Sequence, residues 1–185
     1  MRKLPIYKEE EMYLISIYFD EKTDERFRGY IKQVAKHTGN NAMLDGNVPP
    51  HITVSAFHCC KEETAVSVFR NAVKEICGGK IQFVSVGSFF PQVLFVAPVL
   101  SEYLHQMSIS IYKEVIEYED VVVGERTRPF GWMPHTTIGK EFSPEQLHQA
   151  FGIMQKYFSP FKGEAVKIGL ARTNPYTDIE TYVLK

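Results

Sequence analysis

The chain has 185 residues, of which 44% are apolar and 13% are aromatic. This length and composition fit one globular domain with a sizeable core, or two small lobes that share a core, and exclude a disordered chain. The 21 basic and 22 acidic residues leave a net charge of −1. Proteins that track a long nucleic acid usually carry a basic excess, so we expect a small substrate, or a short end held in a local basic pocket.

No segment is typical of a targeting signal or a membrane span. Residues 1–14 have no uninterrupted apolar region, unlike a secretory signal. The longest nearly uncharged stretch, residues 81–100, contains Pro91 and Pro98 and is better explained as two strands joined by a turn. We therefore expect a cytoplasmic protein with no membrane association.

The three cysteines do not indicate a disulfide framework or a metal centre. Cys59, Cys60 and Cys77 form an odd set without a C-x-x-C spacing. Cys59 and Cys60 are adjacent, so on a strand their side chains point to opposite faces and do not converge on one zinc ion. We interpret all three as buried or half-buried thiols and expect neither a metal nor a cofactor.

Hydrophobic periodicity and turn residues divide the chain into alternating strands and helices. The predicted elements are, in order, a strand at 12–19, a helix at 20–39, a loop at 40–50, a strand at 51–57, a helix at 61–79, two strands at 80–90 and 92–99, a helix at 100–118, a loop at 124–140 with a short strand from His135, a helix at 143–158, and two strands at 163–174 and 178–185. This pattern predicts an α+β fold.

One short motif occurs twice. Pro50-His51-Ile52-Thr53-Val54 and Pro134-His135-Thr136-Thr137-Ile138 share the pattern Pro-His-x-Thr-apolar and lie 84 residues apart. Each copy is followed by the same predicted elements, which indicates a weak internal duplication. Because side chains at i and i+2 share a face of a strand, each motif presents one imidazole beside one hydroxyl, while the residues between them point into the core.

Two histidines and two hydroxyls suit phosphodiester cleavage without a metal ion. Histidine titrates near neutrality, so one imidazole can take a proton from the nucleophile while the opposite imidazolium gives one to the leaving oxygen. Threonine hydroxyls can donate hydrogen bonds to non-bridging phosphate oxygens. A histidine at a strand end that is satisfied by the backbone is the plain alternative for each motif alone, and the repetition of the motif favours catalysis.

The two motifs, each followed by a helix, resemble those of the two-histidine phosphoesterase superfamily, in particular its bacterial RNA 2',5'-ligase and cyclic phosphodiesterase branch. The resemblance covers about residues 12–184 and implies a bilobal α+β fold, with two antiparallel sheets that face a central cleft and helices on the outside. It implies one two-lobed domain over residues 1–185 and activity on 2',3'-cyclic phosphate ends or 2',5'-linked nucleotides. The catalytic histidines would be His51 and His135, and the phosphate-binding hydroxyls Thr53 and Thr137.

The sequence departs from the pattern of this superfamily at two positions. Thr136 stands where an apolar residue is more usual, and Lys140 stands where relatives often carry arginine. Further possible substrate contacts are the basic and aromatic residues around the second motif and two aromatics at turns, because aromatic rings stack on bases beside basic groups: Arg126, Arg128, Trp132, Lys140, Phe90 and Tyr176. A solvated loop is the alternative for each of them.

Two other classes of function remain as alternatives. A non-catalytic module that binds a nucleotide or an RNA end could use the same fold, although binding alone does not need two titratable groups. A metal-dependent hydrolase would need a ligand set that the sequence does not show. The partner in each case is a nucleotide or short RNA end that carries a phosphodiester, and we expect a monomer. The physiological substrate, a ligase activity and the division of acid and base roles between the histidines stay open.

Overall fold

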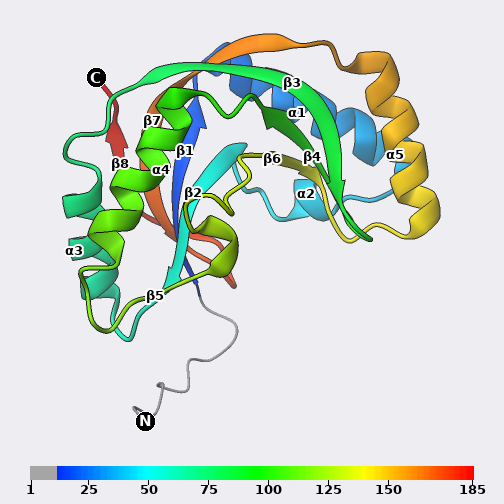
Figure 1. Ribbon diagram of the computed structural model, residues 1–185. Helices are drawn as coiled ribbons and strands as arrows, with labels where there is room; N and C mark the ends of the chain where they lie inside the picture. Colours follow the sequence, from blue (N-terminus) through cyan, green and yellow to red (C-terminus); the bar gives the residue numbers. More distant parts are fainter. Residues whose placement is uncertain (1–11) are drawn as a thin grey trace.

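The computed structural model describes residues 12–185 (Figure 1). Most of the segment on which the prediction about a secretory signal rests lies outside these residues. Within them, no helix is long and apolar enough to span a bilayer. The elements are β1 (Tyr13–Phe19), α1 (Glu21–Thr38), α2 (Ala42–Asp45), β2 (His51–His58), α3 (Glu62–Ala72), β3 (Gly79–Phe89), β4 (Val93–Pro98), α4 (Glu102–Val115), β5 (Val122–Val123), the short 3-10 helix η1 (Glu125–Thr127), β6 (Thr136–Gly139), α5 (Pro144–Tyr157), β7 (Phe161–Arg172) and β8 (Thr177–Val183).

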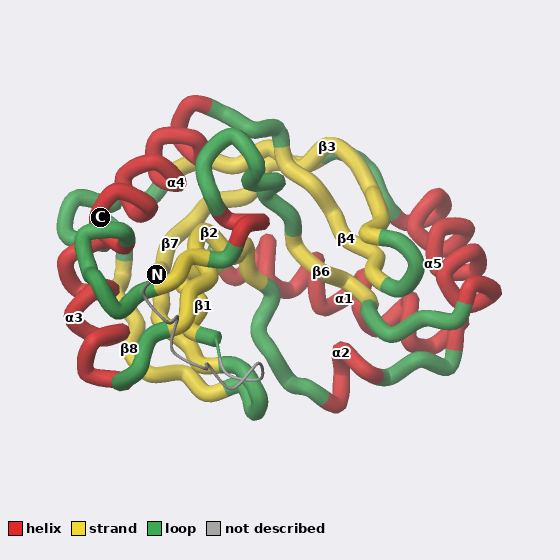
Figure 2. Tube along the Cα trace, turned by 60° about the horizontal axis from the view of Figure 1, so that its bottom comes forward, coloured by secondary structure: helices red, strands yellow, loops and turns green. Residues whose placement is uncertain are grey.

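The eight strands form one antiparallel sheet with the order β5-β2-β1-β7-β3-β4-β6, and β8 also pairs with β7. The predicted α+β class is confirmed, but the two predicted sheets are continuous with each other. They join where Gly79–Phe83 of β3 pairs with Phe161–Ala165 of β7. The sheet curls so that β2 contacts β6, although these strands lie near opposite ends of the order (Figures 1 and 2).

The strand order shows how the internal repeat is built. β1 lies between β2 and β7, and β4 lies in the same way between β6 and β3. The repeated unit is therefore strand-helix-strand-helix-strand: β1, α1, β2, α3 and β3, followed by β4, α4, β6, α5 and β7. The sequence predicted a unit that begins one strand later, at each histidine. Local periodicity cannot show which distant strands pair, and this explains the difference.

Each half of the curled sheet is covered by two helices on its outer side (Figure 1). The His51 half comprises β5, β2, β1, β7 and β8, with α3 and α4, which contact each other and β2 or β7. The His135 half comprises β6, β4 and β3, with α1 and α5, which contact each other and β6 or β4. Since α1 follows β1 but covers the other half, and α4 does the same after β4, the two halves exchange helices.

Aromatic side chains fill the junction between the halves. Phe83 of β3 stacks on Phe161 of β7 with ring centroids 4.9 Å apart, directly at the strand pair that joins the two halves. Phe27 of α1 and Phe19 of β1 meet Phe83 edge to face at 5.0 and 5.5 Å. Rings in these geometries add packing energy to the burial of large apolar surfaces. The junction is therefore part of the core, and it fixes one half against the other.

Local sequence signals account for the ends of the longest helices. The carboxylate of Asp20 accepts a hydrogen bond from the backbone N–H of Thr23 and caps α1, which ends at Thr38 and is followed by Gly39 as its C-cap with φ 71°. Ser143 and Gln146 form a capping box at the start of α5. The predicted helix at 61–79 is shorter than expected, and α3 ends at Ala72. The structure contains three short elements that the sequence did not indicate: α2 and η1 in the predicted loops, and β5 between the predicted helix at 100–118 and the loop at 124–140.

Candidate active site

The two motif histidines have the same local geometry. His51 begins β2, and His135 lies one residue before β6. Nδ1 of His51 lies 2.8 Å from the carbonyl oxygen of Pro49, and Nδ1 of His135 lies 2.8 Å from that of Met133. A carbonyl oxygen only accepts, so Nδ1 carries the proton in both rings. Nε2 is then the nitrogen that can exchange a proton with a substrate in each neutral imidazole.

Burial governs the titration of both rings. It lowers the pKa of His51, and the nearby His135 lowers it further, while the bond to Pro49 and the charge of Asp178 act in the opposite direction. Burial also lowers the pKa of His135, against the bond to Met133. Since the ordinary value is near 6.5, both free imidazoles favour the neutral form at pH 7. His135 is thus one of the groups whose charge acts on His51.

The motif threonines take the positions that the strand period predicts. Thr53 and Thr137 are half-buried, whereas the residues between and after the motif positions are buried: Ile52, Val54, Thr136 and Ile138. The predicted orientation of the two strands is confirmed. Ser16 of β1 lies opposite Thr53, and its hydroxyl donates to Thr53 Oγ1 at 3.4 Å. The proton of the Thr53 hydroxyl therefore remains available for another acceptor.

A cavity of about 550 Å³ brings residues of the two motifs together. His51 of the first motif and Thr137 of the second both line it, with Lys140 and Tyr176. Most of the remaining wall is apolar and comes from β1, α2 with the loop after it, and the β7–β8 turn: Leu14, Ala42, Met43, Val48 and Pro175. Lys140 Nζ also lies 3.2 Å from the carboxylate of Glu141. The cavity offers an imidazole, a hydroxyl and a cation beside an apolar wall.

Trp132 does not have the surface that base stacking requires. It is only 7% exposed, and its indole Nε1–H donates to the carbonyl oxygen of Thr53 at 2.9 Å. The predicted stacking role is therefore corrected to a structural one. The bond ties the segment before β6 to β2 and so links the two motifs directly.

Three other predicted contacts lie away from the cavity wall. Arg126 and Arg128 are exposed in and just after η1, where Thr127 binds the backbone of Ala56 near the far end of β2. Phe90, at the β3–β4 turn, is 81% exposed and borders a different hollow beside α5. The structure thus brings Lys140 and Tyr176 to the cavity, and it does not bring these three residues there.

The surroundings of the two rings differ. On the His51 side, Tyr18 lies directly opposite His51 in the β1–β2 pair, with ring centroids 6.2 Å apart. On the other side, His135 packs against two phenyl rings, Phe89 at 4.8 Å and Phe95 at 5.3 Å. The first imidazole therefore has a polar neighbour, and the second has an apolar one.

Sequence reasoning did not identify Ser16, Tyr18 or Asp178. Ser16 and Tyr18 alternate on the first strand, and only the pairing of β1 with β2 places them beside the motif. Asp178 follows Tyr176, which was a candidate, by two residues. An alternating polar face on a strand that pairs with the histidine strand is the signal that could have located the first two.

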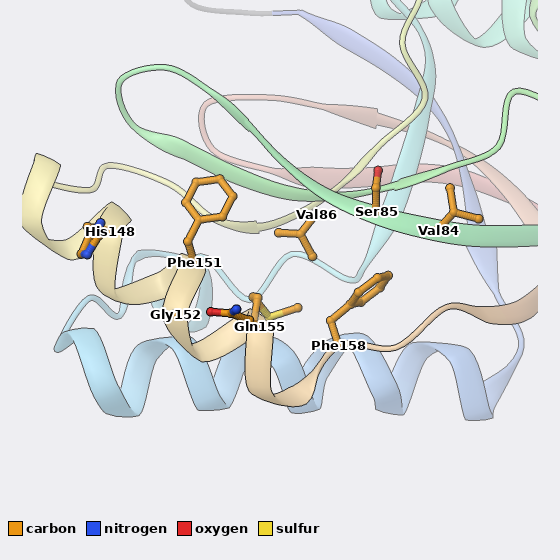
Figure 3. Close-up of a pocket in the computed structure, with 9 residues that line it drawn as sticks. Val84, Ser85, Val86, His148, Phe151, Gly152, Gln155 and Phe158 are labelled. Carbon is orange, nitrogen blue, oxygen red and sulfur yellow. The ribbon is translucent and has the colours of Figure 1, made fainter.

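A second hollow, of about 570 Å³, lies between β3 and α5 (Figure 3). Its side chains are mainly apolar, and Val86, Phe151 and Phe158 point into it. It includes one imidazole, His148, and neither motif histidine. The cavity with His51 and Thr137 is therefore the better candidate active site. Among residues 12–185, no group of three or more His, Cys, Asp or Glu side chains is arranged to hold a metal ion.

The cysteines differ in part from the prediction. Cys59 is half-buried, and burial raises its pKa to about 11, so it remains a thiol. Cys60 and Cys77 are exposed, and the expectation that they are buried is wrong. Cys60 lies beyond the end of β2, and Cys77 lies beyond the early end of α3, so neither is held in a core-facing element.

The fold resembles that of several solved structures. A crystal structure named only as a phosphoesterase aligns with a TM-score of 0.64 and 14% identity over 96% of this chain and 99% of the other. Escherichia coli LigT complexed with 3'-AMP aligns with a TM-score of 0.63, 14% identity and the same coverage. TT0787 of Thermus thermophilus aligns with a TM-score of 0.62 and 16% identity over 94% and 97% of the two chains.

The family is shown by a match to a protein-family model. The model of the 2'-5' RNA ligase superfamily matches residues 23–176, a range that includes both histidine motifs. The chain therefore belongs to the 2'-5' RNA ligase superfamily, and the predicted resemblance is confirmed. No curated protein sequence matches the chain.

Proposed function

We propose that this protein is a metal-independent phosphoesterase that opens 2',3'-cyclic phosphate ends or cleaves 2',5'-linked nucleotides. The observation that carries the proposal is the shared cavity. His51 of one motif and Thr137 of the other line it, and His135 is close enough to influence the titration of His51. Membership of the 2'-5' RNA ligase superfamily supports the same chemistry.

The proposed reaction is general acid–base hydrolysis. One neutral imidazole takes a proton from water through Nε2 while the water oxygen attacks phosphorus. The bond from phosphorus to the 3' oxygen breaks, and the opposite imidazolium gives its proton to that oxygen, which leaves a 2'-phosphate. The protonation states of the two rings are then reversed, and exchange with solvent restores them. Thr53 and Thr137 donate hydrogen bonds to the non-bridging oxygens.

The charge in the cavity favours a substrate with a single phosphodiester. Lys140 is the one lysine or arginine among the residues that line the cavity in the described part of the chain, and Asp45 lines it too. One cation matches a monoanionic phosphodiester better than a chain of phosphates. The apolar wall can hold one base, and the crystal structures of E. coli LigT with 3'-AMP and with ATP indicate that this fold accepts nucleotides. We therefore infer a nucleotide or a short RNA end as the substrate.

A binding module on the same fold is the second candidate, and the paired imidazoles argue against it. Binding a phosphate needs donors or charge, and it does not need two rings whose Nδ1 atoms are both tied so that Nε2 can exchange protons.

The test is turnover of nucleoside 2',3'-cyclic phosphates and 2',5'-linked dinucleotides in the presence of a chelator. We expect the wild type to form a 2'-phosphate from the cyclic substrate, and the His51→Ala, His135→Ala double variant to form none above background. Nucleotide binding that persists in both proteins without any product would favour the binding module. Turnover that the chelator abolishes would show a metal-dependent hydrolase instead.

A further inference from the structure

Two tyrosines and an aspartate form a hydrogen-bonded chain beside the candidate site. The hydroxyl of Tyr176 donates to Asp178 Oδ1 at 2.9 Å, and the hydroxyls of Tyr18 and Tyr176 lie 2.9 Å apart. A phenol hydroxyl can donate only one hydrogen bond. Because Tyr176 donates to the carboxylate, Tyr18 is the donor in the second bond. Burial is the main cause that raises the pKa of both phenols, which therefore remain protonated.

The chain of bonds ends next to His51. Tyr18 and His51 are directly opposite each other in the antiparallel pair of β1 and β2, so their side chains share a face. Gly169 of β7 makes room for the Tyr18 ring, because a Cβ atom at this position would lie 2.9 Å from Tyr18 Cε2. The three side chains come from β1, the β7–β8 turn and β8, three segments that only the folded sheet brings together.

The aromatic neighbours of His135 in the described part of the chain are of another kind. The rings that pack against it are Phe89 and Phe95, which carry neither a hydroxyl nor a charge. Gly87 leaves the space that the Phe95 ring occupies, since a Cβ atom there would lie 2.6 Å from that ring. A glycine on the neighbouring strand thus accommodates a ring in each half, but the ring is a phenol beside His51 and a phenyl beside His135.

We propose that Tyr18, Tyr176 and Asp178 are positioning residues that make His51 the general acid and His135 the general base. The carboxylate and the two aligned hydroxyl dipoles favour a cation at His51, whereas the phenyl rings around His135 favour a neutral base. This assignment rests on the proposed phosphoesterase function. It deepens that function by giving each of two nearly identical histidines its own step.

The other charges around His51 do not replace the effect of Asp178. His135 opposes a cation at His51, and Lys140 lines the cavity beside Glu141. Asp45 of α2 lines the cavity wall without a bond to the chain of tyrosines. On the other side of Tyr18, a neighbouring hollow contains acidic and basic groups in equal number besides Asp178: Glu21, Asp24, Arg28 and Lys167. Asp178 is the carboxylate that Tyr176 links to Tyr18, the residue directly opposite His51, and its charge acts to raise the pKa of His51.

The first experiment does not depend on activity. The imidazole Cε1–H resonances of His51 and His135 are followed by NMR from pH 4.5 to 8.5 in the wild type, Asp178→Asn, Tyr176→Phe and Tyr18→Phe. We expect Asp178→Asn to shift the titration of His51 to lower pH and to leave that of His135 in place, with the two phenylalanine variants shifting His51 in the same direction. Glu180→Gln is the matched control, because Glu180 is on the same strand and also accepts from a tyrosine, Tyr182, but pairs with Arg70.

The second experiment measures kcat/KM against pH on a 2',3'-cyclic nucleotide. An acid must be protonated, so activity is lost as the pH rises through the pKa of His51, and Asp178→Asn should move this alkaline limb to lower pH. At pH 7.5 we expect a loss on the order of 3- to 10-fold, while the acidic limb, which His135 sets, stays in place. Equal shifts of both limbs, or no shift of His51 in the NMR titration, would overturn the assignment. A protein without turnover whose His51 titration still shifts would contradict the proposed function and leave the coupling of Asp178 to His51 established.

Discussion

The His51 half and the His135 half share one backbone plan and differ in the side chains around it. In each half, a histidine with Nδ1 tied to the carbonyl oxygen two residues earlier precedes a half-buried threonine. The strand beside the motif strand contributes Ser16 and Tyr18 in one half and Phe95 in the other. The two repeats therefore share the groups that we propose to react, while the immediate neighbours of these groups differ.

This difference matters because general acid–base catalysis needs one protonated and one neutral partner. Two identical imidazoles in identical surroundings would have equal proton affinity, and the productive state, with one charged and one neutral, would have two equivalent forms. A carboxylate whose hydrogen-bonded chain ends beside one ring, and phenyl rings around the other, favour one of these forms. Different neighbours can thus assign the acid role to one histidine and the base role to the other.

The largest expected effect separates the two histidines by their leaving-group dependence. His51→Ala and His135→Ala should each lower kcat on a 2',3'-cyclic nucleotide on the order of 10²–10⁴-fold. On a nucleoside p-nitrophenyl phosphodiester, whose leaving group departs without a proton, we expect His51→Ala to lose less than about 10-fold because a general acid is not required. His135→Ala should remain slow on both substrates. The reverse pattern in steady-state kinetics would exchange the roles.

Substitution of the motif threonines should lower activity less than substitution of the histidines, and by a similar factor in both halves. Thr53→Val and Thr137→Val remove one phosphate donor each without a large change in volume, and each should lower kcat/KM on the order of 10²-fold. Ser16→Ala changes only the partner of Thr53, so a loss of about 2- to 5-fold is expected from a less well-oriented hydroxyl. Assays of the three variants on one cyclic substrate compare them. Full activity in both valine variants would remove the threonines from the proposed site.

The hydrogen bond from Trp132 to Thr53, which links the two motifs, is tested by measuring the free energy of unfolding. Trp132→Phe removes the indole N–H that binds the carbonyl oxygen of Thr53, and we expect the free energy of unfolding to fall by about 1–3 kcal/mol. Phe130→Leu is the control in the same loop, since Phe130 is 92% exposed, and should change stability by less than about 0.5 kcal/mol. Urea unfolding measures both. A wild-type stability with a raised KM in Trp132→Phe would restore the stacking role.

Variants of three basic residues test how far the bound substrate extends beyond the cavity. Lys140→Gln should raise KM about 5-fold, because the exposed side chain contributes one charge contact. Arg126→Gln and Arg128→Gln should leave KM within about 2-fold, since neither residue lines the cavity. Measurements with a mononucleotide and with a short RNA ending in a cyclic phosphate complete the comparison. A loss confined to the RNA in the arginine variants would extend the binding surface to η1.

The smallest expected effect is on the pH dependence of stability. Burial lowers the pKa of both histidines, so the unfolded chain binds more protons than the folded one as the pH falls below the ordinary value near 6.5. Stability is then complete above this value and is lost as the pH drops through the lowered folded-state values. The His51→Gln, His135→Gln double variant should have a flatter urea midpoint between pH 7.5 and 5. Identical slopes in both proteins would contradict this prediction.

Much of this fold was accessible from the sequence because its signals are local. The cap at Asp20, the left-handed Gly39 and the Ser143 capping box set the ends of two long helices where they were predicted. The strand period placed Thr53 and Thr137 correctly from the motif alone. That all 185 residues form one unfolding unit stays a prediction, which the shape of the urea transition also tests.

The rest depends on pairing between distant strands. Thr53 faces Ser16 because the register of β1 and β2 shifts between Ile15 and Ser16, and a second irregularity, between Leu170 and Ala171 of β7, sets which residue of β8 lies opposite Ala171. No period in the sequence reports such shifts. The burial of Trp132 was missed for the same reason, because its partner is a backbone carbonyl 79 residues away.

The exchange of α1 and α4 between the halves has a consequence for how the site can be assembled. β1 and α1 are separated by Asp20 alone, yet they lie in different halves, so each repeat covers its own half with one helix and gives its other helix to the opposite half. A fragment of one repeat would leave an apolar sheet face open to water, and only its complement could close it. The arrangement is that of an intertwined dimer of half-length chains joined into one polypeptide. Two separately expressed repeats should therefore be insoluble apart and reconstitute the shared cavity when they are made together.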